Sequence, residues 1–112
     1  KDIVEITSRN NGTSINLAFN YGGRTEIIDA INKNKSAKIT NKVLSKNLYI
    51  PNLPDPDLII RTGGEMRLSN FLLWQSAYAE LYFTNILWPN FKIKSLNRIL
   101  FKYLNRIRKY GR

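Results

Sequence analysis

The 112-residue sequence contains no cysteine and no histidine. The absence of cysteine excludes disulfide bonds and thiolate metal sites, and the absence of histidine removes the commonest general base and metal ligand. Any metal ion that the chain binds must therefore be held by oxygen ligands. The sequence also lacks a secretory leader and an apolar run long enough to span a membrane, and it begins with Lys1 instead of methionine. We therefore expect a piece of a longer chain.

Acidic residues are scarce, and they are confined to the first part of the chain. Lys and Arg number 18 against 8 Asp and Glu, which gives a formal net charge of +10. Residues 1–90 hold ten basic and all eight acidic residues, whereas residues 91–112 hold eight basic residues and no acidic one. A basic excess favours binding to nucleic acid or to an acidic membrane surface, but it also fits a compositional bias in a chain rich in Asn, Lys and Ile. Both interpretations remain open.

The first half of the sequence predicts one strand and two helices. Residues 13–21 alternate apolar and polar side chains, a pattern typical of a strand, and Gly22-Gly23 marks its end. A helix should follow and run through Ile31. Thr40 is predicted to be the N-cap of a second, short helix.

The second half predicts two strands and two helices. Residues 51–57 include three prolines, which end regular structure, and residues 58–61 then form a short apolar run typical of a covered parallel strand. Residues 71–79 are predicted to be a helix, and residues 80–86 another strand. A final helix is predicted from one apolar stripe at helical spacing. The stripe consists of Leu96, Ile99, Leu100, Tyr103, Leu104 and Ile107.

The alternation of strands with helices predicts an α/β fold in which a parallel sheet is flanked by helices. Three strands would make a narrow sheet with exposed edges, whereas parallel sheets are usually wider and covered. We therefore expect further strands outside these residues.

The stretch "RTGGEMRLSN" at residues 61–70 concentrates features that suit a negatively charged group. Arg61 should lie at the carboxyl end of a parallel strand, where open α/β sheets place ligands. The two glycines let the backbone approach a ligand or adopt positive φ, and Ser69 should open a helix whose N–H groups favour an anion. Arg61 and Arg67 add planar guanidinium groups, so a diphosphate is expected here. The competing interpretation is a common turn in which Ser69 only caps and one arginine pairs with Glu65.

Two blocks of the sequence resemble the undecaprenyl diphosphate synthase family, whose members are also called cis-prenyltransferases or isoprenyl transferases. The blocks are "LAFNYGGRTEI" at residues 17–27 and "LPDPDLIIRTGGEMRLSNFLLWQSAYAELYFTNILWPNF" at residues 53–91. Essentially the whole chain aligns, but only with the C-terminal half of such an enzyme. The resemblance implies that residues 1–112 are the C-terminal half of a single catalytic domain and that the N-terminal half is absent.

The resemblance also implies a reaction, the sequential cis condensation of isopentenyl diphosphate onto an allylic diphosphate such as farnesyl diphosphate. The product would be a long polyprenyl diphosphate, a lipid carrier for cell-wall synthesis. By the family's pattern, Glu80 matches a position assigned to Mg²⁺, which prefers few carboxylates together with phosphate oxygens and waters. The competing interpretation of Glu80 is an ordinary polar residue at the start of a strand. Positions that hold the diphosphate of isopentenyl diphosphate are matched by Arg61, Arg67, Leu68 and Ser69.

The resemblance further implies a homodimer built through the apolar and aromatic run at residues 81–91, and a cytoplasmic protein with peripheral membrane contact. The alternative is a basic α/β module that binds nucleic acid or a partner protein without catalysis. We expect no nucleic-acid partner, because Trp74, Tyr78, Tyr82 and Trp88 lie within apolar runs instead of forming an exposed aromatic platform.

The sequence departs from the family's pattern at three places. Met66 stands where some members carry a histidine near the metal. Lys109-Tyr110-Gly111 stands where members carry an Arg-x-Gly motif directed at the partner subunit's active site, and lysine keeps the charge but loses the bidentate fork. No Asp-Gly-Asn-Gly-Arg-Trp-like motif of the N-terminal half is present. The catalytic residues are therefore expected outside this chain, and the chain alone is expected to be inactive.

Overall fold

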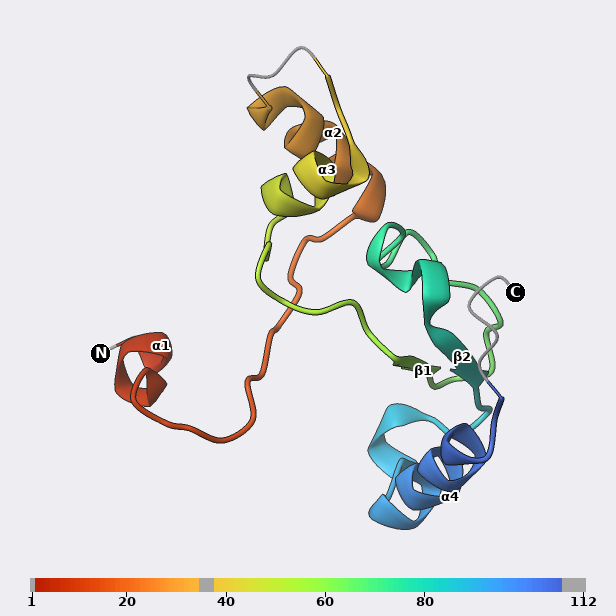
Figure 1. Cartoon of the computed structure of the whole chain (residues 1–112). Coiled ribbons are helices and arrows are strands. Elements are labelled where there is room, and N and C mark those ends of the chain that lie inside the picture. The colour runs from red at the N-terminus through yellow and green to blue at the C-terminus, as the bar shows by residue number, and fades with distance from the viewer. Residues whose placement is uncertain (1, 35–37, 108–112) are drawn as a thin grey trace.

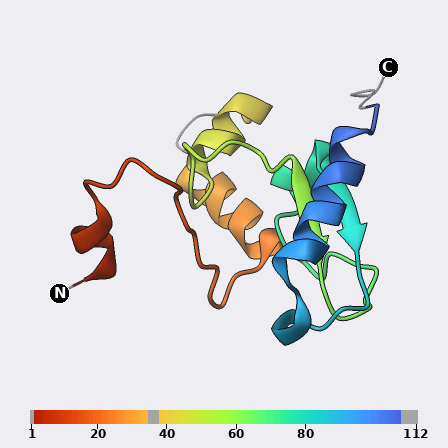
Figure 2. The same ribbon diagram turned by 90° about the horizontal axis from the view of Figure 1, so that it is seen from below.

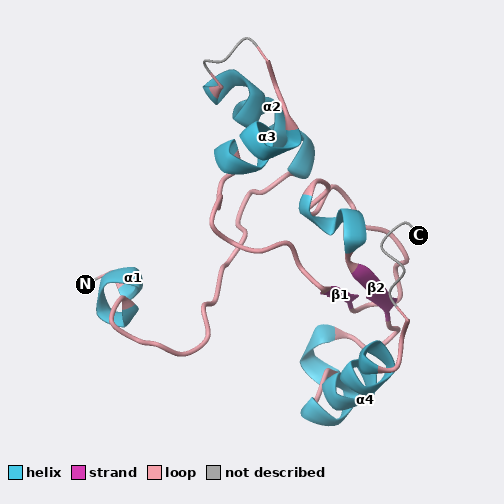
Figure 3. Ribbon diagram, in the orientation of Figure 1, coloured by secondary structure: helices cyan, strands magenta, loops and turns pink. Residues whose placement is uncertain are grey.

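The computed structural model describes residues 2–34 and 38–107 of the chain. Among these residues, Figure 1 and Figure 3 show a small sheet with helical segments next to it and further helices set apart from it. The Lys109-Tyr110-Gly111 triplet lies outside the described residues. The elements in chain order are α1 (Ile3–Thr7), α2 (Gly23–Lys33), α3 (Asn41–Asn47), β1 (Leu58–Arg61), the 3₁₀ helix η1 (Gln75–Tyr78), β2 (Glu80–Phe83), the 3₁₀ helix η2 (Trp88–Asn90) and α4 (Ile93–Leu104).

The sheet consists of β1 and β2, which pair in parallel with Leu58 opposite Glu80 and Arg61 opposite Phe83. Backbone hydrogen bonds continue the pairing past both ends, and Thr84 N–H donates to the carbonyl of Arg61 at 2.9 Å. The predicted α/β class, with a parallel sheet flanked by helices, is therefore confirmed. The predicted strand at residues 80–86 is shorter than expected, because it ends at Phe83.

Helix α4 covers one face of this sheet, as Figure 2 shows. It is the predicted final helix, and it begins and ends three residues earlier than the apolar stripe. Ile99 is buried, and it lines a cavity of about 140 Å³ together with Leu58 and Leu81 from the strands. Leu104 and Ile107, at the end of the stripe, are exposed. Among the described residues, only part of the predicted apolar face is therefore buried.

Helices α2 and α3 form a second small unit, and both were predicted. Thr40 caps α3 as expected, because its Oγ1 accepts a hydrogen bond from the N–H of Val43 at 3.3 Å. Ala30 of α2 packs with Leu44 and Leu48 in a buried apolar cluster, and Trp74 from the segment before η1 covers it. Trp74 thus joins the helical pair to the chain that leads into β2.

A buried glutamate fixes the same junction. Glu26 on α2 is only 2% exposed. Its carboxylate accepts hydrogen bonds from Tyr21 Oη at 2.5 Å, from Gln75 Nε2 at 3.0 Å and from the Tyr49 N–H at 3.0 Å. Burying a charge is costly unless hydrogen bonds replace its hydration, and three donors do so here. Glu26 therefore ties α2 to the segments that hold Tyr21, Tyr49 and Gln75.

The predicted strand at residues 13–21 was wrong for the described structure, in which residues 13–18 are irregular. The alternating side chains of Ile15, Leu17 and Phe19 are 81%, 74% and 83% exposed. A strand needs a neighbour for its backbone N–H and C=O groups and a surface for its apolar face. Neither is available to this segment within the described residues.

The predicted helix at residues 71–79 was largely wrong, because only the 3₁₀ turn η1 forms there. Ser69, Asn70 and Leu72 have positive φ angles of 49°, 67° and 45°. Left-handed backbone cannot be part of a right-handed α-helix, so the chain begins its helical turn only after Leu72.

The 112 residues leave much surface uncovered. The accessible area is 9695 Å² and the radius of gyration is 16.6 Å. A compact domain of this mass would expose roughly 6,300 Å² and have a radius of gyration of about 13 Å. The exposed surface includes large apolar side chains such as Phe19, Trp88 and Leu104. Among the residues that the structure describes, no helix has the length and apolar character needed to cross a membrane.

The junction at Glu26 predicts a fall in stability at alkaline pH. Burial, together with the hydrogen bond to Glu26 and its negative charge, raises the pKa of Tyr21 well above its ordinary value. The folded state then keeps a proton that the unfolded state loses near pH 10. The stabilising contribution of the Tyr21–Glu26 pair is therefore fully present below that pH. The free energy of unfolding should fall as the pH rises above it. Tyr21→Phe should flatten this decline in chemical unfolding between pH 8 and 11.

Tyr78→Phe is the matched control, because Tyr78 is exposed. This variant should keep the parental pH dependence. An equal flattening in both variants would show that the Tyr21–Glu26 pair is not the cause.

Candidate functional site

Residues 61–70, called the clamp loop below, begin at the carboxyl end of β1. Arg61 is the last residue of that strand, and the parallel register puts it opposite Phe83, the last residue of β2. The expected position of Arg61 at the carboxyl edge of a parallel sheet is therefore confirmed. This is the edge where open α/β sheets bind ligands.

Two glycines turn the chain directly after Arg61. Gly63 and Gly64 have φ angles of 91° and 86°, which side chains rarely allow. Their N–H groups donate to the carbonyls of Ile86 and Thr84 at 3.0 and 2.9 Å. The glycines thus supply a left-handed turn that is bonded to the chain after β2, and these two N–H groups are already used within the protein.

The Arg61 guanidinium is held by the far side of the same loop. Its Nη1 donates to Ser69 Oγ at 2.9 Å and to the carbonyl oxygen of Arg67. Among the described residues, Nε and Nη2 of Arg61 have no acceptor. The group is therefore fixed in place while part of its donor fork is left for another acceptor.

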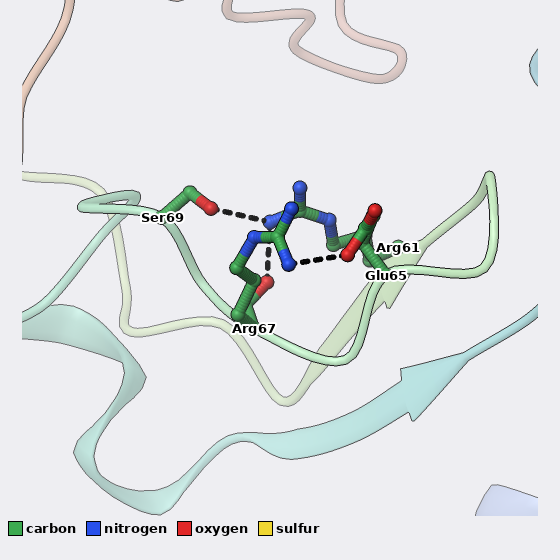
Figure 4. A network of polar contacts seen from close by, with 4 residues as sticks. All are labelled: Arg61, Glu65, Arg67 and Ser69. Atoms are coloured by element: carbon green, nitrogen blue, oxygen red, sulfur yellow. Dashed lines mark hydrogen bonds and ion pairs between the residues drawn. The ribbon is translucent and has the colours of Figure 1, made fainter.

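Arg67 extends into the same space as Arg61, as Figure 4 shows. It forms an ion pair with Glu65, which is the pairing that the competing sequence interpretation expected. The two side chains are 61% and 50% exposed. Exposed ion pairs of this kind contribute little, about 0 to 1 kcal/mol, so Glu65 does not commit Arg67 to a structural role.

Ser69 does not open a helix, so the helix N-terminus expected at this position was wrong. Its φ of 49° and that of Asn70 turn the chain the other way. Instead, the loop itself offers backbone donors, because the N–H groups of Arg67, Leu68 and Ser69 donate to no described residue. Leu68 is half-buried, and its carbonyl accepts from Phe71 N–H at 3.1 Å.

Glu80 lies apart from the clamp loop. It begins β2 opposite Leu58, three residues before the position paired with Arg61, which corresponds to about 10 Å along the strands. Its Oε2 forms an ion pair with Arg106, just after α4. The structure therefore brings Arg61, Arg67, Leu68 and Ser69 into one loop and keeps Glu80 at the opposite end of the sheet.

Residues 2–34 and 38–107 contain no cluster of three or more His, Cys, Asp and Glu residues that could hold a metal ion. Met66 is exposed in the clamp loop and offers only a thioether. Each candidate site has one carboxylate. Glu65 belongs to the clamp loop, and Glu80 belongs to β2.

Sequence reasoning missed two residues at these sites. Arg106 binds Glu80 across 26 residues of chain, and no local pattern indicates such a pairing. Asn70 hydrogen-bonds the N-terminus of α2, a segment far from it in the sequence. A signal for the second contact did exist, because α2 begins after Gly22, which has no side chain to cap it.

Comparisons with known proteins agree with this fold. The family model for undecaprenyl diphosphate synthase matches residues 1–111. An isoprenyl transferase of Fusobacterium nucleatum is 51% identical over 112 residues, which span 97% of this chain and 48% of that protein. The isoprenyl transferase of Thermotoga maritima is 47% identical over 118 residues, spanning 99% of this chain and 51% of that protein.

A solved structure has the same architecture. It comes from Campylobacter jejuni, is described as a probable undecaprenyl diphosphate synthase, and superposes with a TM-score of 0.87 at 40% identity, covering 96% of this chain and 52% of its own. The chain thus spans about half the length of the relatives that it matches. By sequence and by fold, the chain belongs to the undecaprenyl diphosphate synthase family.

Proposed function

We propose that the clamp loop binds the diphosphate of isopentenyl diphosphate in an enzyme that carries out sequential cis condensation onto an allylic diphosphate. The observation that supports this most strongly is the fixed guanidinium of Arg61, held by Ser69 and the Arg67 carbonyl at the carboxyl edge of the sheet. A group that is already oriented loses little freedom when its ligand arrives.

The donors of the loop suit a diphosphate better than a smaller anion. Arg61 keeps Nε and Nη2 without a partner among the described residues, Arg67 is held only by an exposed ion pair, and Ser69 adds a hydroxyl. Guanidinium groups match pairs of phosphate oxygens and form charge-assisted hydrogen bonds with them. A diphosphate has enough oxygens to use both arginines and the backbone N–H groups of residues 67–69 at once.

The condensation needs two diphosphate sites, and this chain supplies one in the proposal. The N-terminal half that the relatives carry would supply the allylic diphosphate site, the catalytic groups and the cover for the exposed apolar surface. A structural relative, the lavandulyl diphosphate synthase of Lavandula x intermedia, was crystallised with dimethylallyl diphosphate. We call this chain joined to such an N-terminal half the full-length enzyme. With labelled isopentenyl diphosphate, the 112 residues alone should form no condensation product, and the full-length enzyme should.

Changing Arg61 or Arg67 to Ala in the full-length enzyme tests the diphosphate assignment. Each change removes charge-assisted hydrogen bonds worth on the order of 1.5 to 3 kcal/mol, so KM for isopentenyl diphosphate should rise roughly ten- to a hundredfold. Arg61→Lys should recover only part of the loss, because an ammonium group lacks the planar fork.

The matched control is Arg98→Ala on α4, which removes the same charge from an exposed position away from the clamp loop. It should leave KM for isopentenyl diphosphate within about twofold, since surface charges act weakly through solvent. Unchanged kinetics in both Arg61→Ala and Arg67→Ala would remove the basis of the proposal.

Mg²⁺ is part of the same proposal, with Glu80 as its ligand in this chain. Arg106 occupies Oε2 of Glu80, whereas Oε1 accepts from no described residue, so one carboxylate oxygen is available to a hard cation. When bound, the ion would neutralise diphosphate charge. Because Glu80 lies about 10 Å along the strands from Arg61, the two residues would serve different phosphates or different subunits.

Glu80→Gln and Arg106→Gln should change the Mg²⁺ requirement in opposite directions. The first removes the carboxylate and should raise the Mg²⁺ concentration for half-maximal activity of the full-length enzyme roughly tenfold. The second removes the competing cation and should lower it. A Mg²⁺ titration that is unchanged in Glu80→Gln would assign Glu80 a structural role only.

A second copy of the chain is the proposed cover for the run at residues 81–91. Leu87 and Trp88 are 60% and 75% exposed, and Trp88 stacks on Phe91 with ring centroids 6.1 Å apart. Aromatic and aliphatic surface of this kind is typical of subunit interfaces. The expectation that Trp88 and Tyr78 would not be exposed was wrong, which keeps a nucleic-acid surface as the competing function.

Sedimentation of the full-length enzyme distinguishes a second copy of the chain from a nucleic acid as the partner of this surface. We expect a dimer that Trp88→Glu converts to a folded monomer, because a buried charge would be left unpaired at the interface. A monomer that binds short single-stranded RNA in a salt-dependent way, and loses that binding in Trp88→Glu, would favour the nucleic-acid surface.

A further inference from the structure

Asn70 joins the end of the clamp loop to the start of α2. Its backbone carbonyl accepts from Gly23 N–H at 2.7 Å, and its side-chain Oδ1 accepts from Arg24 N–H at 2.9 Å. The first N–H groups of a helix need acceptors from outside the helix, and Gly22 has no side chain to supply one. Asn70 therefore caps a helix that begins 47 residues earlier in the chain.

The contact is close because two glycines permit it. A Cβ at Gly22 would lie 2.7 Å from Nδ2 of Asn70, and one at Gly23 would lie 2.9 Å from Cγ of Leu73. Real Cβ atoms do not approach neighbours so closely, so a side chain at Gly22 would displace the Asn70 amide and one at Gly23 would displace Leu73. Gly22-Gly23 and Asn70 thus form one matched contact between separate segments.

At this contact, two residues that are not glycine adopt left-handed backbone conformations. Ser69 and Asn70 have φ angles of 49° and 67°. Asparagine tolerates this conformation, but serine adopts it seldom, and such a residue keeps it only where its surroundings impose it. The two hydrogen bonds of Asn70 to α2 impose it here. Ser69 in turn accepts from Arg61 Nη1 at 2.9 Å, so the place of the Arg61 guanidinium depends on the same turn.

We propose that Asn70 is a positioning residue for the diphosphate clamp. By binding the N-terminus of α2, it holds Ser69 in the left-handed turn and thereby orients Ser69 Oγ and the Arg61 guanidinium toward one phosphate. Its side-chain oxygen is engaged by Arg24 N–H, so it acts on the ligand through Ser69 and Arg61. This inference rests on the proposed function, in which the clamp loop binds the diphosphate of isopentenyl diphosphate.

The chain downstream of Asn70 is fixed independently. Trp74 Nε1 donates to Ser45 Oγ at 3.1 Å, and Gln75 Nε2 donates to Glu26 at 3.0 Å. These bonds keep the segment on α2 and α3 when Asn70 is changed. Loss of the Asn70 side chain should therefore loosen the clamp loop without releasing the rest of the connection to β2.

The test uses the full-length enzyme and two variants that disturb the contact from opposite sides. Asn70→Ala removes the side-chain acceptor. Gly22→Ala displaces the Asn70 side chain from the other side of the contact, and it leaves the sequence of the clamp loop unaltered. Both should weaken binding of inorganic pyrophosphate, measured by calorimetry, about tenfold, the effect of one lost charge-assisted hydrogen bond. Both should raise KM for isopentenyl diphosphate by a similar factor, with kcat and KM for the allylic diphosphate within about twofold.

The matched control is Asn97→Ala, which removes an exposed asparagine side chain from α4. Thermal unfolding of each variant accompanies the binding measurement, and all titrations are made where every variant is folded. If Asn70→Ala does not fold, Gly22→Ala still decides the question, because its extended backbone accepts alanine and only the contact with Asn70 is affected.

The outcomes separate the two proposals. Parental pyrophosphate affinity in Asn70→Ala and Gly22→Ala, together with a lowered melting temperature, would make Asn70 a helix cap and overturn the positioning role while the diphosphate site stands. Absence of pyrophosphate binding by the parental enzyme would overturn the diphosphate site and the role of Asn70 with it.

Discussion

Parallel pairing of β1 with β2 is the constraint on which the site depends. Two parallel strands cannot be joined by a tight turn, because the chain must return to the starting edge of the sheet before the second strand begins. The connection therefore leaves from the carboxyl edge with Arg61 and spans residues 62–79. Its first part turns through Gly63 and Gly64 and becomes the clamp loop, and its second part packs on α2 and α3.

The same arrangement explains why a charged loop can be rigid. Exposed arginine side chains usually sample many rotamers, and ordering them opposes binding. Here the Arg61 head is held by Ser69, and Ser69 follows from the left-handed turn that Asn70 anchors on α2. The buried Glu26 junction fixes the segments around α2, Asn70 binds α2, and the turn at Asn70 in turn orients the Arg61 guanidinium. The conformational entropy of the arginine side chain is therefore lost on folding, before any ligand binds.

Apolar patterns and capping signals in the sequence were sufficient to find α2, α3, β1, β2 and α4, because each of these elements has its partner within the described residues. The strand predicted at residues 13–21 has a clear alternation but no neighbouring strand among the described residues, which therefore leave its apolar side chains exposed. The helix predicted at residues 71–79 was prevented by the left-handed turn at Ser69, Asn70 and Leu72, which local apolar spacing does not reveal.

The candidate site was predictable in part for similar reasons. Arg61, Arg67, Leu68 and Ser69 are close in sequence, so any loop between parallel strands brings them together. The pairing of Glu80 with Arg106 and the capping of α2 by Asn70 join segments that are distant in sequence. Such contacts follow from how the helices pack on the sheet, and composition and spacing do not specify them.

The most direct measurement is a crystal structure of the full-length enzyme with isopentenyl diphosphate. The account predicts a diphosphate within hydrogen-bonding distance of the Arg61 and Arg67 guanidinium groups and of Ser69 Oγ, with Ser69 and Asn70 still left-handed. A diphosphate of isopentenyl diphosphate bound elsewhere, with Arg67 still paired to Glu65 and Arg61 still directed only at its own loop, would contradict it.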